Sequence, residues 1–239
     1  MLLLGLPMAA ATGEGETTAT TEVLTIADLP HFDAAYRILR NGRTLAEVRR
    51  TLRCSEVSCE YRQQGHTTGF VNVIVRGELD EVSRFLVVDG ALVPNRYYYR
   101  EKLLGKEQVA DLHFDPATLQ ISNRGDKEWV KEYPADGIDE LLAQLQLMLA
   151  VMRGERELAF NVIDRRGRAR EYAFRISGEE AVTTAAGELR AVRVDYLDAR
   201  RPGRETYIWF APEFAYLPVL IHQEREDGTT WRYELTELP

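Results

Sequence analysis

Residues 205–238, ETYIWFAPEFAYLPVLIHQEREDGTTWRYELTEL, decide the fold of this chain, because they read as β-strands joined by tight turns. The Asp227-Gly228 pair separates two runs that are rich in β-branched and aromatic residues. An Asp-Gly pair in such a setting is the strongest short-range signal for a β-hairpin. The stretch therefore predicts antiparallel strands at the end of the chain.

The same alternation of strand and turn recurs through most of the sequence. Asn41-Gly42 and Asp89-Gly90 have the chemistry of hairpin turns. Further turns are expected at Leu104-Gly105, at Asp115-Pro116 and at residues 164–167, 185–187 and 201–203. About a dozen strands at short spacing predict a mainly β fold, with one antiparallel sheet or barrel in a single domain over residues 30–239.

One helix interrupts the strands. Apolar residues recur at helical spacing over residues 138–153, with Asp136 as the expected N-cap and Gly154 as the expected stop. Leu147 and Val151 lie opposite the main apolar stripe, so the helix is apolar on more than one face. This favours a helix lodged on the concave side of a curved sheet. The alternative is a helix packed across one sheet face with two apolar side chains exposed.

Two cysteines bear on the cellular compartment. Cys54 and Cys59 bracket four residues between stretches that read as strands. If these four residues form a hairpin loop, the cysteines face each other at a separation that a disulfide can bridge. In the alternative, a continuous strand, the odd spacing would put the thiols on opposite faces. We expect the disulfide, which indicates an oxidising compartment such as the periplasm.

Residues 1–29 are expected to form a leader. Met1–Ala11 is apolar and ends in Ala9-Ala10-Ala11, which suits a signal peptidase, but the segment is short and lacks a basic start. It therefore reads either as an atypical or truncated signal peptide or as an apolar tail. The following residues 12–29 are rich in Thr, Glu and Gly and are expected to be flexible.

Composition and motifs exclude several classes of function. The formal net charge of -8 argues against a nucleic-acid partner, and no apolar run reaches the roughly 20 residues of a membrane-spanning helix. We expect no metal site, because ligand spacing is absent around His31, His66, His113 and His222. No phosphate loop, dinucleotide fingerprint or nucleophile elbow is present, so neither a cofactor nor a catalytic residue is expected.

Several longer motifs carry a resemblance to a known family. They are FDAAYRILRNG (32–42), SRFLVVDG (83–90), DLHFD (111–115), GEEAVTTAAGELRAVRV (178–194) and WFAPEFAYLPV (209–219). The chain resembles bacterial domain-of-unknown-function family 3108, a set of uncharacterised envelope proteins, from about Phe32 to Leu235. The resemblance implies a β-rich fold and export across the inner membrane, and it assigns no catalytic residue.

The family pattern is also broadly similar to the lipoprotein-carrier folds of the bacterial envelope. In these folds a strongly curved antiparallel sheet forms a half-barrel around helical segments, and its concave face suits acyl chains or another apolar group. We therefore expect a non-catalytic, periplasmic protein that binds an apolar or lipid-like ligand. The expected ligand-binding residues are Leu145, Leu149, Met152, Phe160, Phe174 and Trp209.

Two other functions stay open. One is an interaction or assembly protein with a filled core, which docks on an envelope partner through a sheet edge or through the arginine-rich tips at residues 165–170 and 200–204. The other is a hydrolase that acts on cell-wall sugar or lipid. Its carboxylates would come from turns, where acidic side chains are normally solvated: Glu179, Glu180, Glu213, Glu224 and Glu226.

Overall fold

The computed structural model describes residues 24–69, 72, 76–198 and 202–237. The expected signal-like segment and the tip at Arg200-Arg201 lie outside these residues. Within them, fifteen strands form one sheet in the order β8-β7-β6-β5-β4-β3-β2-β1-β15-β14-β13-β12-β11-β10-β9. The strands are β1 (Phe32–Arg40), β2 (Arg43–Cys54), β3 (Cys59–Thr67), β4 (Gly77–Val88), β5 (Ala91–Leu103), β6 (Lys106–Asp115), β7 (Gln120–Asn123), β8 (Trp129–Glu132), β9 (Ile138–Asp139), β10 (Glu157–Ile163), β11 (Ala169–Thr184), β12 (Gly187–Tyr196), β13 (Arg204–Ala211), β14 (Leu217–Arg225) and β15 (Thr230–Leu235).

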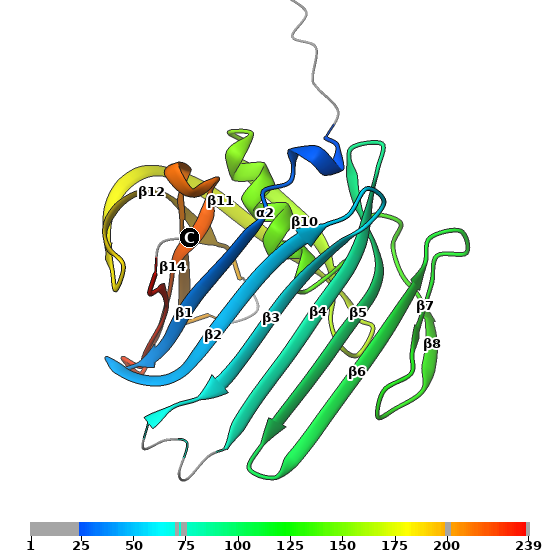
Figure 1. The fold of residues 1–239 in the computed structure, drawn as a ribbon, viewed down its shortest axis with the longest axis horizontal. Helices are drawn as coiled ribbons and strands as arrows, with labels where there is room; N and C mark the ends of the chain where they lie inside the picture. Colours follow the sequence, from blue (N-terminus) through cyan, green and yellow to red (C-terminus); the bar gives the residue numbers. More distant parts are fainter. Residues whose placement is uncertain (1–23, 70–71, 73–75, 199–201, 238–239) are drawn as a thin grey trace, which may run out of the picture.

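The first and last strands meet in the middle of the sheet. β1 pairs with β15 in an antiparallel register, and from this pair the sheet extends in two directions (Figure 1). We call β1–β8 the N-terminal arm and β9–β15 the C-terminal arm. Neighbouring strands are antiparallel except for β9 and β10, which run parallel. The sheet therefore consists of two antiparallel meanders, β1–β8 and β10–β15, which join where β1 pairs with β15, and β9 adds to β10 in parallel at one edge.

The predicted hairpin turns are confirmed. Asn41 and Gly42 have φ values of +49° and +76°, and Asp89 and Gly90 have +50° and +81°. Two successive positive φ angles define the type I′ turn, whose twist matches that of the flanking strands. Sequence pattern therefore places these strand ends correctly.

The expected count of about a dozen strands is too low. β8 and β9 are too short to show an alternating pattern, and they were not expected as strands. Conversely, Gly178 does not end a strand, because β11 continues through it with a β-bulge and a φ of +126°. Glycine accommodates this backbone, so the bulge bends a sixteen-residue strand without breaking it.

The helix α2 (Leu142–Met152) begins later than predicted. Asp139, not Asp136, satisfies its first amides: Asp139 Oδ1 accepts from the backbone N–H groups of Leu141 at 3.1 Å and Leu142 at 2.8 Å. The Asp136 carboxylate instead accepts from Asn161 Nδ2. Ile138 and Asp139 form β9, so the apolar Ile138 belongs to a strand and not to the helix.

The predicted stop at Gly154 is confirmed. Gly154 has a φ of +74°, and its N–H donates to Val151 O at 3.0 Å while Glu155 N–H donates to Ala150 O at 3.1 Å. These two bonds form a Schellman motif, which satisfies carbonyls at the end of the helix. The left-handed backbone at Gly154 is the feature that requires glycine.

α2 is surrounded by the sheet. It contacts β5 of the N-terminal arm and β9 and β10 of the C-terminal arm (Figure 1). Eight of its eleven residues are buried, and the others are Gln144, Gln146 and Met152. A helix that is apolar all round belongs in a core, so its two apolar faces are both used.

The edge strand β8 approaches the β10–β11 turn of the C-terminal arm through side chains. The Trp129 ring of β8 covers Gly167, in the turn between β10 and β11, so closely that no Cβ would fit there. Lys131 Nζ of β8 donates to Arg166 O of the same turn at 2.5 Å. These contacts join the arms without strand pairing, and the sheet is curled but open.

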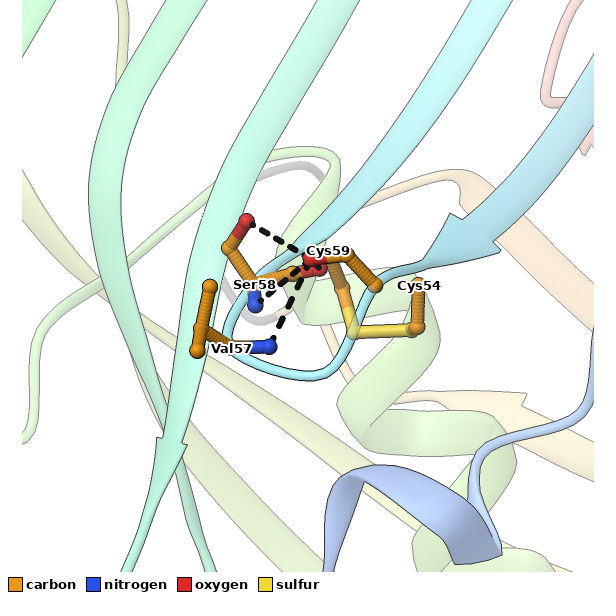
Figure 2. The surroundings of a disulfide bond; sticks show 5 residues. Cys54, Val57, Ser58 and Cys59 are labelled. Carbon is orange, nitrogen blue, oxygen red and sulfur yellow. Dashed lines mark hydrogen bonds between the residues drawn. A yellow bond between two sulfur atoms is a disulfide. The ribbon is translucent and has the colours of Figure 1, made fainter.

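The predicted disulfide is present. Cys54 and Cys59 are paired residues at the end of the β2–β3 hairpin, with their Cα atoms 4.0 Å apart (Figure 2). The intervening loop is closed by Ser55 N–H, which donates to Ser58 O at 2.9 Å. The hairpin interpretation of this segment is therefore confirmed, and the continuous strand is excluded.

Candidate ligand-binding site

A cavity of about 300 Å³ lies between α2 and the C-terminal arm. Most of its lining is apolar or aromatic. Two charged side chains also line it, Arg50 from β2 and Glu140 from the turn before α2. It is lined by Arg50, Glu140, Ala143, Gln144, Leu147, Tyr172, Phe174, Tyr196, Thr206, Ile208, Phe210, Pro218 and Ile221.

The alternation of side chains along each strand places the aromatic residues on the cavity side of the sheet. Thr206, Ile208 and Phe210 occupy alternate positions of β13 and therefore face the same side of the sheet. Tyr172 and Phe174 do the same on β11. The opposite wall comes from α2, where Ala143 and Leu147 are one helical turn apart.

Arg50 is the unusual member of this lining, because only 3% of its surface is exposed. Its Nε donates to Gln63 Oε1 at 2.7 Å, and its guanidinium carbon lies 4.4 Å from the centroid of the Tyr233 ring. Its Nη1 is buried and has no hydrogen-bond partner among the described residues. No carboxylate of those residues forms an ion pair with Arg50.

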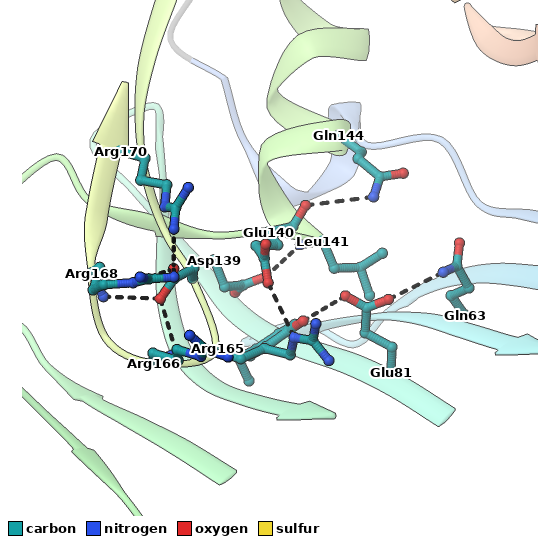
Figure 3. Close-up of polar contacts among 12 residues, drawn as sticks. Gln63, Glu81, Asp139, Glu140, Leu141, Gln144, Arg165, Arg166, Arg168 and Arg170 are labelled. Atoms are coloured by element: carbon teal, nitrogen blue, oxygen red, sulfur yellow. Dashed lines mark hydrogen bonds and ion pairs between the residues drawn. The ribbon is translucent and has the colours of Figure 1, made fainter. Parts of the chain in front are cut away.

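Gln63 connects Arg50 to the buried carboxylate of Glu81 through two hydrogen bonds. Gln63 Nε2 donates to Glu81 Oε2 at 3.1 Å (Figure 3). Tyr97 Oη donates to Glu81 Oε1 at 2.6 Å. Burial raises the pKa of Glu81, while these hydrogen bonds and the charge of Arg50 oppose that rise. Both oxygens of Glu81 are thus engaged within the core.

Two more acidic side chains lie close to the start of α2 (Figure 3). Burial raises the pKa of Asp139 to about 7, against the hydrogen bond that its Oδ2 accepts from Ser83 Oγ at 2.6 Å. Burial also raises the pKa of Glu140 to about 7, with Glu81 as a further cause. The Glu140 carboxylate lies 3.8 Å from Arg165 Nε.

A second, more polar cavity of about 570 Å³ adjoins the first, since Glu140 and Tyr172 line both. Four of its basic residues, Arg165, Arg166, Arg168 and Arg170, come from the β10–β11 turn and the start of β11, and Lys127 also lines it. Arg168 and Arg170 form ion pairs with Asp164 at 2.6 and 3.2 Å. One carboxylate thus serves two of these arginines, so the positive charge at this turn is only partly balanced by the ion pairs of the described residues.

The six expected ligand-binding residues are spread over the structure. Phe174 lines the 300 Å³ cavity, and the Phe160 ring lies behind it at a centroid distance of 5.9 Å. Leu145 and Leu149 are buried in the core on another side of α2, and Met152 is 36% exposed. Trp209 faces the other side of β13, where its Nε1 donates to Glu180 Oε1 at 2.6 Å.

Sequence reasoning missed Arg50, Glu140 and Gln144. For Arg50 the signal was present, because it alternates with Val48 and Leu52, which are both buried. That parity places Arg50 on the inner face. The helix sequence also held a signal for the cavity. Leu147, which lines the cavity, belongs to the second apolar face of the helix, whereas the expected ligand-binding residues came from the main apolar stripe.

The carboxylates that a hydrolase would need are all exposed: Glu179, Glu180, Glu213, Glu224 and Glu226. The expectation that they come from turns is wrong for three of them, because Glu179 and Glu180 lie in β11 and Glu224 lies in β14. Across the described part of the chain, no three His, Cys, Asp or Glu side chains are grouped so that they could hold a metal ion. In the same part, no helix has the length and apolar character needed to cross a membrane.

Comparison with known proteins identifies the family. The family model described as Protein of unknown function (DUF3108) matches residues 31–236. The chain belongs to this family. The resemblance to DUF3108 seen in the sequence motifs is thereby confirmed. A comparison with curated proteins finds no match.

Solved structures show where the DUF3108 fold has relatives. The β-barrel-like protein of domain of unknown function DUF1849 from Brucella abortus is 12% identical, with a TM-score of 0.55 over 87% of this chain and 96% of that one. The two proteins therefore share a fold. A "putative lipoprotein" from Parabacteroides distasonis is 13% identical over 88% and 97% of the chains, but its TM-score of 0.32 supports no argument.

Proposed function

We propose that this DUF3108 protein is a non-catalytic, exported envelope protein that binds an apolar or lipid-like ligand between α2 and the C-terminal arm. The observation that carries the proposal is the 300 Å³ cavity with its wall of Leu147, Phe174, Ile208 and Phe210. Ligand pockets are concave, mostly apolar and supplied with a few polar groups, and their volumes begin near 300 Å³.

The curl of the sheet supports this proposal. A helix inside the curl of the sheet gives the cavity a wall that the sheet alone does not supply. α2 contacts both arms, and it presents Ala143, Gln144 and Leu147 to the cavity. The small side chain of Ala143 leaves space at this wall.

The disulfide supports export. Cys54 and Cys59 are the two cysteines of the chain, and both are used in one bond. Disulfides persist in oxidising compartments and are rare in the cytosol. We therefore propose the periplasm as the site of action.

The buried carboxylates favour a binding protein over the hydrolase. Glu81 accepts hydrogen bonds from Tyr97 and Gln63 on its two oxygens. Asp139 is occupied by Ser83 and by the first amides of α2. Only Glu140 reaches the cavity, and glycoside hydrolysis uses a pair of carboxylates.

The test is a fluorescence titration with 1-aminonaphthalene, a neutral apolar probe of eleven heavy atoms, on protein purified without detergent and stripped of lipid. The wild type is expected to bind the probe with saturable enhancement. A143F fills the cavity and is expected to weaken binding at least tenfold. A159F adds the same side chain at an exposed position of β10 and should bind as the wild type does. The proposal fails if the folded wild type does not bind the probe, or if A143F binds it unchanged.

A further inference from the structure

Arg50 places a charged donor in the ligand cavity without a partner for one of its nitrogens. It lines the cavity, it is 3% exposed, and its Nη1 has no hydrogen-bond partner among the described residues. A buried donor that is left unsatisfied costs free energy, and the cost is larger for a charged group. Such a group in the wall of a cavity points to an acceptor on the ligand.

The charge of Arg50 is also incompletely balanced. Its contacts within the core are the neutral oxygen of Gln63, the faces of the Tyr36 and Tyr233 rings, and hydrogen bonds with Tyr61 and Tyr233. The nearest relayed carboxylate, Glu81, has both oxygens engaged by Gln63 and Tyr97. A negative charge on the ligand would therefore meet a cation that lacks an ion-pair partner among the described residues.

We infer that the ligand carries an anionic head group, which the Arg50 guanidinium holds by a charge-assisted hydrogen bond while the apolar chain lies against Phe174 and Phe210. The inference rests on the proposed function and specifies the chemistry of its ligand. An N–H donor of a guanidinium and a carboxylate oxygen form one of the stronger hydrogen bonds in proteins, especially away from water.

The size of the cavity limits the chain. A dry cavity of roughly 150 Å³ binds benzene, which has six heavy atoms. A cavity of about 300 Å³ therefore has room for about twelve heavy atoms by the same scale. Decanoate, with ten carbons and two oxygens, matches this volume and serves as the probe.

Glu140 affects how an anionic ligand binds, because it lines the same cavity as Arg50. Burial raises its pKa to about 7, so its carboxyl is mostly protonated in mildly acidic solution and does not repel an anion there. Arg165, 3.8 Å from Glu140, offsets the charge that remains at higher pH. Titrations at pH 6 therefore test Arg50 with the least interference.

The experiment displaces 1-aminonaphthalene with three ligands of equal chain length: decanoate, decan-1-ol and decyltrimethylammonium. In the wild type, decanoate is expected to bind at least tenfold more tightly than decan-1-ol, and the cation most weakly. R50M should reduce the preference for decanoate over decan-1-ol to less than twofold. R49M removes an arginine from the other face of the same strand, where it pairs with Asp33, and should keep the wild-type preference.

Each outcome is decisive. Equal binding of decanoate and decan-1-ol to the wild type, or tighter binding of the cation, overturns the inference and leaves the proposed function standing. Absence of binding by all three ligands and by the probe removes the proposed function itself. If R50M does not fold, the wild-type series still decides the charge preference. R50K, which keeps a cation, is expected to retain at least half of the wild-type preference for decanoate over decan-1-ol, measured as the logarithm of the affinity ratio. A preference that persists unchanged in folded R50M would show that Arg50 does not hold the head group.

Discussion

Ser83 Oγ of β4 donates a hydrogen bond to Asp139 Oδ2 of β9 at 2.6 Å, and both residues are fully buried. The bond joins the N-terminal arm to the last strand of the C-terminal arm. The other oxygen of Asp139 accepts from the first amides of α2. One carboxyl group thus fixes both the curl of the sheet and the start of the helix that walls the cavity.

S83A is expected to lower the free energy of unfolding by about 1–3 kcal/mol, because it leaves a buried carboxyl oxygen without its donor. Urea denaturation followed by circular dichroism measures this. S177A is the matched control, since Ser177 Oγ donates to Asp195 Oδ2 at an exposed position and its loss should cost less than about 0.5 kcal/mol. Equal effects of the two variants would show that the buried bond does not stabilise the curl.

The unfolding free energy is expected to fall as the pH rises from about 4 to 7. The pKa of Asp139 is raised to about 7 in the folded protein, so the folded state holds a proton that the unfolded state has released. This contribution is fully present below the ordinary carboxyl pKa and is lost as the pH passes through the raised value. D139N, which needs no proton, should flatten the slope in urea titrations across this range. A wild-type slope of the opposite sign would contradict the prediction.

Removal of the disulfide is expected to lower the free energy of unfolding by roughly 2 kcal/mol, the chain-entropy value for so short a loop. Urea denaturation of the wild type and of the C54S/C59S double variant measures the difference. Protein isolated from the periplasm should take up alkylating reagent at its two cysteines only after reduction, as read by intact mass. Two thiols that react without reduction would contradict both the bond and the proposed compartment.

Q63L should be strongly destabilising, by roughly 3 kcal/mol, because Gln63 both accepts from Arg50 and donates to Glu81 inside the core. The neighbouring Gln64 is exposed on the other face of β3, so Q64L changes the same side chain outside the network. Chemical denaturation of both variants gives the comparison. Similar midpoints for Q63L and Q64L would mean that the polar row contributes little to the fold.

Local chemistry was sufficient to predict the turns and the disulfide. Asn41-Gly42 and Asp89-Gly90 adopt the backbone that their residue types favour, independently of distant parts of the chain. The pairing of Cys54 with Cys59 follows from a four-residue loop within one hairpin. The start of α2 depends instead on β9 pairing with β10, a tertiary contact that no local pattern reveals.

The cavity could be predicted only in part. An aromatic wall including Phe174 follows from the apolar pattern of the strands, but Trp209 lies one position out of phase with Ile208 and Phe210. Arg50 was missed because charged residues are normally assigned to the surface, although its strand parity places it inside. What makes its burial tolerable is the pairing of β2 with β3 and the approach of Tyr233, which only the folded sheet provides.

Native mass spectrometry of protein recovered from the periplasm without detergent tests the binding claim most directly. The wild type is expected to carry one small non-covalent adduct, which is released on collisional activation, and A143F is expected to appear as the bare polypeptide. A wild-type protein that is bare under the same gentle conditions, or an A143F variant that keeps the adduct, would contradict a ligand in the cavity beside α2.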